Sequence, residues 1–175
     1  MKYALTYGLL SGLVIIAVML TGLTMTGQDN FFSSEWFRYL VMLVALTFIF
    51  VGVKRFRDVE RGGVIKFGPA LLMGLAIAAV AGLAYVVVWE IYLAATDYRF
   101  MDEYVTGILQ AREAAGASPA ELARKAAELN ELRQSYGNPL FRVPMTFLEI
   151  FPVGLLVALV SAALLRNPKL LPAAR

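Results

Sequence analysis

The sequence contains neither cysteine nor histidine, and only 17% of its residues are charged. Without cysteine the chain has no disulfide, no thiol nucleophile and no thiolate metal site. Without histidine it lacks the commonest general base and metal ligand. Serine-protease triads, zinc hydrolases and cysteine acyltransferases are therefore excluded, and we expect no cofactor and no catalytic residue. A carboxylate-only magnesium or calcium site stays open, although no motif indicates one.

The sequence contains several long runs of apolar residues without charge. Hydrophobic residues make up 59% of the chain, whereas a soluble domain is about half apolar. In lipid every backbone group must be bonded within the protein, and a helix needs about 20 apolar residues to cross. The runs predict an all-α, polytopic membrane protein, a four-transmembrane-helix bundle built as one domain over residues 1–175. The expected spans are residues 3–25, 35–53, 67–96 and 140–165.

The first run, residues 3–25, superficially resembles the apolar part of a signal peptide. It is longer than that part usually is, and no small-x-small cleavage site follows it. We therefore expect the run to be retained as the first span.

The basic residues indicate how the spans are oriented. Lys2, the loop at 54–66 and the tail after residue 165 together carry nine bases against two acids. The break between the first two spans has no base, and segment 97–139 has about as many acids as bases. Because bases in short loops stay inside, we expect both termini and the 54–66 loop in the cytoplasm, in a cell inner membrane. Segment 97–139 then lies outside.

Segment 97–139 has the pattern of two amphipathic helices rather than of a linker. Apolar residues recur at helical spacing from Met101 onward, until Gly116 breaks the run. Ser118 then begins a second helix as its N-cap, with a capping-box acid at Glu121. We therefore expect an extracytoplasmic amphipathic helical hairpin between the third and fourth spans, lying on the outer interface of the membrane.

Small residues recur every four positions within the spans. The third span carries Ala70, Gly74, Ala78 and Gly82. The fourth span has the same four-residue spacing of small residues, beginning at Gly154. In lipid such stripes let helix backbones approach closely and associate. We expect them to pack one bundle together, with a dimer interface as the alternative, and the sequence leaves the oligomeric state unknown.

Three segments together are similar to one bacterial family of small four-span membrane proteins, domain-of-unknown-function family 4199. The similarity covers nearly the whole chain in order. The resemblance implies a four-helix inner-membrane protein, with no established activity and no catalytic residues to carry over. The segments are KRFRD at 54–58 with GGVIKFGPALLMG at 62–74, GASPAELARKAAEL at 116–129, and the run from NPLFRVP at 138 to SAALL at 165.

Glu149 is an acid nine residues into the fourth expected span. A carboxylate at such depth costs roughly 2.5–3.5 kcal/mol on insertion scales, so it should face the bundle interior and find a partner. Arg142, Glu90 and Arg38 occupy the same outer layer, and antiparallel packing would join all four residues into one charge cluster. Two interpretations stay open: a proton, ion or head-group site, or a buried ion-pair network that locks the bundle.

The loop at 54–66 holds a second set of candidate contacts. Its bases would attract anionic lipid head groups, each contributing about 1 kcal/mol. A short inside loop is also basic for reasons of orientation alone. The candidate lipid contacts are Lys54, Arg55, Arg57, Arg61 and Lys66.

These features predict an uncharacterised inner-membrane protein, in the first place a non-enzymatic scaffold or accessory subunit that acts through partners. The alternative is a small transporter or lipid-handling protein that uses the charge cluster around Glu149. A third reading is a membrane-embedded enzyme acting on a lipid-linked substrate, with Glu149 as acid or base. The expected partners are membrane lipids and a membrane or periplasmic protein docked on segment 97–139, and no nucleic acid.

Overall fold

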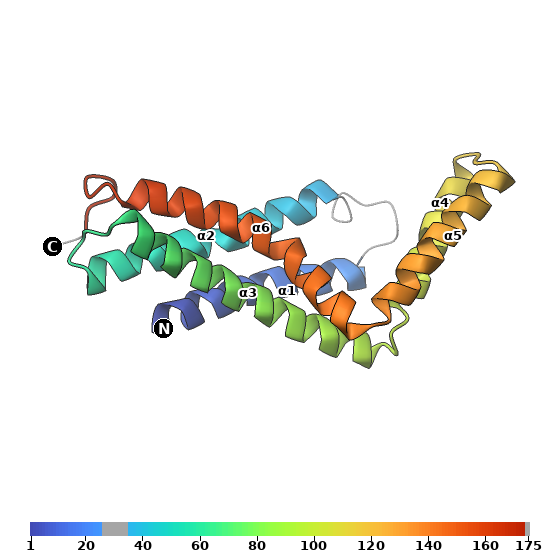
Figure 1. Ribbon diagram of the computed structural model, residues 1–175, viewed down its shortest axis with the longest axis horizontal. Coiled ribbons are helices and arrows are strands. Elements are labelled where there is room, and N and C mark those ends of the chain that lie inside the picture. Colours follow the sequence, from blue (N-terminus) through green and yellow to red (C-terminus); the bar gives the residue numbers. More distant parts are fainter. Residues whose placement is uncertain (26–34, 174–175) are drawn as a thin grey trace. The chain divides into compact units, whose positions relative to one another are not determined.

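The structure, a computed structural model, describes residues 1–25 and 35–173, without the side chains of residues 20–25, 35 and 38. Within these residues the chain forms six helices and no strand (Figure 1). Four of them, α1, α2, α3 and α6, are long and apolar enough to cross a membrane. The all-α fold with four spans is therefore confirmed. The helices are α1 (Lys2–Met25), α2 (Glu35–Glu60), α3 (Phe67–Ala95), α4 (Phe100–Ala114), α5 (Pro119–Tyr136) and α6 (Pro139–Leu165).

Helix α2 continues seven residues beyond the boundary expected at residue 53. Its last two turns carry a Lys54–Asp58 ion pair of 2.5 Å at the i,i+4 spacing that supports a helix. The helix ends where Gly62 and Gly63 adopt positive φ angles of 59° and 85°. The Gly63 N–H then donates to the Arg57 carbonyl at 3.0 Å, which satisfies one of the free carbonyls at the helix end.

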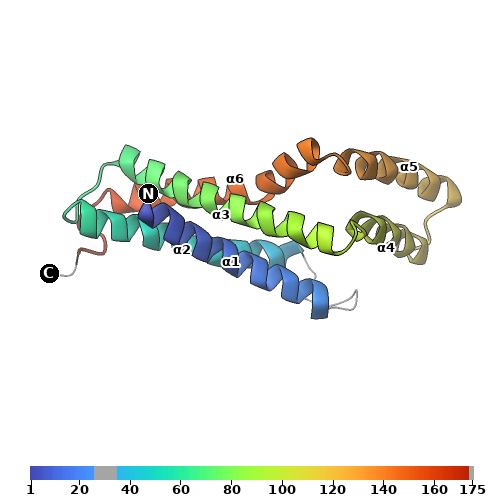
Figure 2. The same ribbon diagram turned by 90° about the horizontal axis from the view of Figure 1, so that it is seen from below.

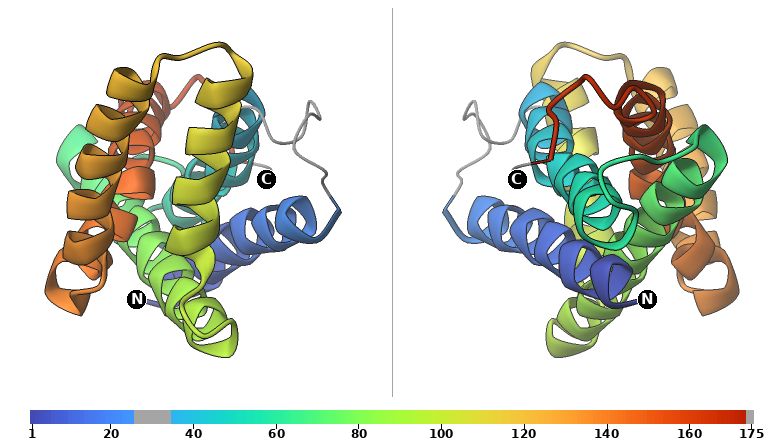
Figure 3. Two further views of the ribbon diagram at one scale, coloured as in Figure 1. Left: turned by 90° about the vertical axis from the view of Figure 1, so that its right-hand side faces the viewer. Right: turned by 90° about the vertical axis from the view of Figure 1, so that its left-hand side faces the viewer.

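The chain divides into two compact units, residues 1–87 with 147–175, and residues 88–146. Each unit is described separately, and the single domain expected from the sequence stays a prediction. The first unit contains α1, α2 and the larger parts of α3 and α6, which run side by side in Figure 2. Figure 3 views them from the two ends of Figure 1, with α1 crossing the view obliquely. Large apolar side chains such as Leu13, Leu72 and Leu156 stay exposed on its outer surface. Lipid is the solvent that such a surface requires.

Small residues bring the helices of the first unit together. A Cβ atom added to Gly74 of α3 would lie 2.8 Å from the Cβ atom of Ala158 on α6. Gly154 of α6 faces Ala78 of α3 in the same way, at 2.8 Å. The predicted packing of the small-residue stripes within one bundle is confirmed, since these backbones approach too closely for larger side chains.

Helices α1 and α2 complete the interior. Gly8 of α1 abuts Val80 of α3, where an added Cβ atom would lie 2.6 Å from the valine Cβ atom. Ile49 of α2 is fully buried and reaches the crossing of α3 and α6. The buried Ser11 hydroxyl of α1 donates to the Ala45 carbonyl of α2 at 2.9 Å. The four helices therefore share one interior, with the polar hydroxyl satisfied by backbone.

In the second unit, α4 and α5 form the helical hairpin that the sequence predicts (Figure 1). Met101 and Val105 of α4 and Leu129 of α5 are its buried residues. Ser118 caps α5, and the reciprocal bonds of a capping box with Glu121 are both present. The hairpin thus uses its apolar face internally and leaves a largely polar surface.

Candidate functional site

The second unit is organised around the guanidinium group of Arg142, which lies one turn into α6 and is only 3% exposed. Its Nε and Nη2 atoms donate to the two carboxylate oxygens of Glu90 on α3, at 2.7 and 2.6 Å. Its Nη1 atom donates to the Tyr136 carbonyl at the end of α5, at 3.0 Å. Two parallel charged hydrogen bonds are the strongest geometry available to an arginine and a carboxylate. The group therefore ties three helices together.

Aromatic rings surround this ion pair. The Arg142 guanidinium carbon lies 5.2 Å from the centre of the Tyr98 ring and 5.8 Å from that of Tyr136. The Trp89 indole N–H donates to the Tyr136 hydroxyl at 2.7 Å, and its ring meets Phe100 edge to face at 4.8 Å. A cation against two ring faces is stabilised further when water is excluded. We call these residues, Glu90, Arg142, Tyr98, Tyr136 and Trp89, the aromatic clamp.

Each nitrogen of Arg142 already donates to a protein acceptor. In the part of the chain that the structure describes, no buried side-chain nitrogen or oxygen lacks a hydrogen-bond partner. The same residues contain no group of three acids that could hold a metal ion. The clamp therefore has the properties of a structural ion pair, because a ligand would have to displace bonds that are already made.

The structure thus brings together two of the four charged residues predicted to cluster, Glu90 and Arg142. Glu149 belongs to the first unit and does have an interaction partner. Its position on α6 is exposed, so the expectation that it faces the bundle interior is wrong. The packed side of α6 carries the adjacent Ile150, and successive residues point in different directions around a helix. The side chain of Arg38 is not among those described. A ligand or proton role for any of these residues stays a prediction. The sequence analysis missed Tyr136, for which its place just before the Gly137 break was the available signal.

A second buried arginine lies in the first unit. The Arg57 side chain of α2 is 0% exposed. It donates to the Asp58 carboxylate at 2.7 Å and to the carbonyls of Leu170 and Leu171 at 3.0 and 2.5 Å. Those bonds fasten the tail after α6 to the end of α2. Burial takes Arg57 out of the set of bases that a lipid head group could reach.

The other four bases of that set differ in exposure. Lys54 is half-buried and bonded to Asp58. Arg55, Arg61 and Lys66 are exposed. Lipid contact by the exposed bases stays a prediction.

The beginning of α1 is tied to the end of α2 through Glu60. The Lys2 ammonium lies 2.8 Å from Oε1 of Glu60, and the Tyr3 hydroxyl donates to the same oxygen at 3.1 Å. The Lys2 side chain remains 72% exposed. An ion pair at this exposure contributes little stability. Its effect is to fix where the tyrosine hydroxyl and the lysine amine lie.

Comparison with known proteins gives one family. The model of a family described as "Protein of unknown function (DUF4199)" matches residues 2–167. No curated protein matches the chain, and no solved structure matches it.

Proposed function

The chain belongs to the DUF4199 family of proteins of unknown function, and from this premise we propose that it is a non-enzymatic scaffold or accessory subunit. It sits in a cell inner membrane with both termini in the cytoplasm. It acts through a protein partner that docks on the α4–α5 hairpin outside the cytoplasm. The orientation rests on the excess of bases at Lys2, in the loop after α2 and in the tail.

The observation that carries this proposal is the prebuilt hairpin. Its two helices contact each other, and Met101, Val105 and Leu129 are their buried residues. The Ser118 capping box fixes the start of α5. An Arg133–Asp102 ion pair of 2.6 Å joins the helices near their open ends. A rigid element costs little conformational entropy when a partner binds it.

The aromatic clamp supports the same proposed function, because it lies where the hairpin joins α3 and α6. It joins α3 near its end, the end of α5 and the first turn of α6, and so ties the hairpin to the helix before it and the helix after it. All the guanidinium nitrogens of Arg142 are already hydrogen-bonded within the protein. Such an ion pair is suited to a structural role, since it holds the end of α5 against α3 and α6. The absence of a cysteine or histidine nucleophile–base pair from the sequence favours partner binding over catalysis.

Site-specific photo-crosslinking tests the proposal. A photoreactive residue at Arg124 or Glu113, both exposed on the hairpin, should give a discrete protein adduct in cells. The matched control places the same residue at Leu13, whose side chain is 58% exposed on α1 and should meet lipid. Absence of a discrete adduct from both hairpin positions, with the protein correctly inserted, would overturn the proposal.

A second candidate is the small transporter or lipid-handling protein, now with Glu149 acting from the exposed side of α6 rather than from a buried charge cluster. Glu149 lies inside the span of α6, and an acid at such a position is by default a candidate functional residue, whether or not it is also paired. A Glu149→Gln variant should then fold normally and fail to complement a deletion strain. Full complementation by that variant would exclude this candidate while leaving the scaffold proposal intact.

A further inference from the structure

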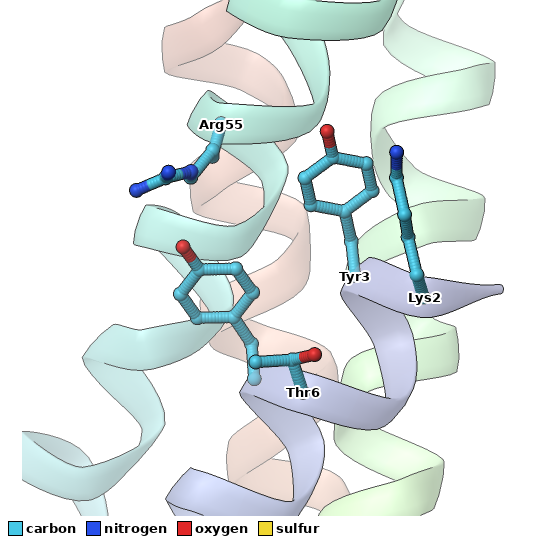
Figure 4. Close-up of a pocket in the computed structure, with 5 residues that line it drawn as sticks. Lys2, Tyr3, Thr6 and Arg55 are labelled. Atoms are coloured by element: carbon cyan, nitrogen blue, oxygen red, sulfur yellow. The ribbon is translucent and has the colours of Figure 1, made fainter.

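A shallow hollow of about 420 Å³ lies between the beginning of α1 and the last turns of α2, within the first unit (Figure 4). Figure 4 shows the Tyr3 ring and the Lys2 amine side by side, with the Arg55 guanidinium on the other side. Five residues line the hollow: Lys2, Tyr3, Thr6, Tyr7 and Arg55.

The charge of this hollow is positive and only partly neutralised. Lys2 is paired with Glu60. Arg55 is exposed, and no hydrogen bond or ion pair joins it to another of the described residues. A guanidinium group in this state offers several N–H donors in a planar fork, the geometry that matches phosphate oxygens.

The hydroxyl groups add neutral donors at fixed places. The Tyr7 ring packs on Gly52 of α2, where an added Cβ atom would lie 2.9 Å from the ring carbon Cγ. Gly52 lies three residues before Arg55 on α2, so this contact holds the Tyr7 ring on the side of α2 that carries Arg55, and both residues line the hollow. Thr6 contributes a second hydroxyl from the same turn of α1. Arginine, lysine and hydroxyl donors are the groups that bind phosphate oxygens.

An apolar strip continues from the hollow along both helices. On α1, Leu10 and Leu13 stand four and seven residues after Thr6 and are exposed. On α2, Val51 and Val44 stand four and eleven residues before Arg55 and are exposed as well. Residues at these spacings share one helix face. A polar hollow above an exposed apolar strip fits a molecule with a phosphate at one end and hydrocarbon chains at the other.

We propose that this hollow binds the phosphate group of an anionic phospholipid, with Arg55 and the Tyr7 hydroxyl as its main contacts. The acyl chains lie along the apolar strip, which a free phosphate ion would leave unused. The site is independent of the hairpin and of any partner that the hairpin binds.

Native mass spectrometry of the full chain in mild detergent tests the proposal. The protein is titrated with phosphatidylglycerol and, separately, with zwitterionic phosphatidylcholine. We expect phosphatidylglycerol to bind more tightly, and Arg55→Gln to weaken its binding about tenfold by removing a charged hydrogen bond. Tyr7→Phe keeps the ring on Gly52 and should weaken binding about threefold, since it removes one neutral donor.

Arg166→Gln is the matched control, because it removes the same charge from an exposed arginine on the segment after α6, outside the hollow. It should leave phosphatidylglycerol binding unchanged. Equal losses in Arg55→Gln and Arg166→Gln would overturn the proposal, since they would indicate diffuse attraction to charge. If inorganic phosphate at the same concentration displaces phosphatidylglycerol, the hollow binds phosphate without the acyl chains, and the proposal of a lipid ligand is overturned. Unchanged thermal melting of each variant checks that folding is intact.

Discussion

Arg142 and Glu90 are 52 residues apart in the sequence and meet fork to fork, with nitrogen–oxygen distances of 2.7 and 2.6 Å. One lies in the first turns of α6 and the other near the end of α3. Their pairing closes the base of the α4–α5 hairpin, because Arg142 also bonds the Tyr136 carbonyl at the end of α5. Within the second unit the ion pair thus links the ends of α3 and α6 to α5 of the hairpin that we propose to be the docking surface.

A double-mutant cycle measures this link. Arg142→Gln and Glu90→Gln should each destabilise the protein in detergent, with a coupling energy of about 2 kcal/mol, because each leaves a poorly exposed charge unpaired. The Arg133–Asp102 pair is the control, since both of its side chains are about half exposed and its coupling should stay below about 1 kcal/mol. Equal coupling in the two cycles would contradict a structural role for the clamp.

The close contact between α3 and α6 predicts an asymmetry between two glycines of the same helix. Gly74→Ala should lower stability by about 1–3 kcal/mol, because its Cβ atom would lie 2.8 Å from that of Ala158. Gly68→Ala adds the same methyl group where nothing lies within 4 Å, and it should cost no stability. Thermal melting of both variants in one detergent tests this. Similar melting temperatures for the two variants would contradict the prediction, because α3 and α6 would then move apart at Gly74 without loss of stability.

Buried Arg57 predicts that the tail after α6 is held to α2. Arg57→Gln should cost about 2–3 kcal/mol, since it removes charged hydrogen bonds to the Leu170 and Leu171 carbonyls. Because the chain has no cysteine, a single Ala173→Cys change reports on the tail, and its maleimide labelling should accelerate in the Arg57 variant. Lys66→Gln, which removes an exposed charge nearby in sequence, should leave the labelling rate unchanged. Equal rates in all backgrounds would show that Arg57 does not hold the tail.

The capping box of α5 predicts a pH dependence. Hydrogen bonds from the Ser118 backbone and hydroxyl hold the pKa of Glu121 below its ordinary value. Because the pKa is lower in the folded state, this contribution to stability is complete above the unfolded pKa of about 4.3 and is lost as pH falls through the folded pKa. NMR titration of the Glu121 carboxyl carbon should show a lowered midpoint, and Ser118→Ala should raise it. The same midpoint in both proteins would contradict the capping box.

The proposed orientation predicts where reporters become active. Fusions at Gly62 and after α6 should be active as cytoplasmic reporters, because these segments carry the excess of bases. A reporter inserted at Gly116, in the turn between α4 and α5, should be active only outside the cytoplasm. A C-terminal fusion active outside the cytoplasm would contradict the proposed topology.

The sequence by itself determined the four apolar helices and the hairpin between α3 and α6. The apolar runs, Gly116 and the Ser118–Glu121 pair act over a few residues, and helix formation responds to such local signals. The same signals placed the end of α2 seven residues early, because its basic turns are polar and yet helical. A boundary drawn where an apolar run ends marks the edge of the hydrophobic stretch, and the helix itself continues until Gly62 and Gly63.

The tertiary structure alone decided how the charges are used. The sequence placed Glu90 and Arg142 in one outer layer with two other charged residues, and only the approach of α3 and α6 decided that these two pair with each other. Arg57 and Arg55 are two residues apart in one basic run, yet one is buried against the tail and the other lines an exposed hollow. Helical spacing puts neighbouring residues on different faces, and only packing determines which face meets a partner helix. The choice of partner in the Arg142–Glu90 and Arg57–Leu170 contacts, 52 and 113 residues apart in sequence, therefore cannot be predicted from a local pattern.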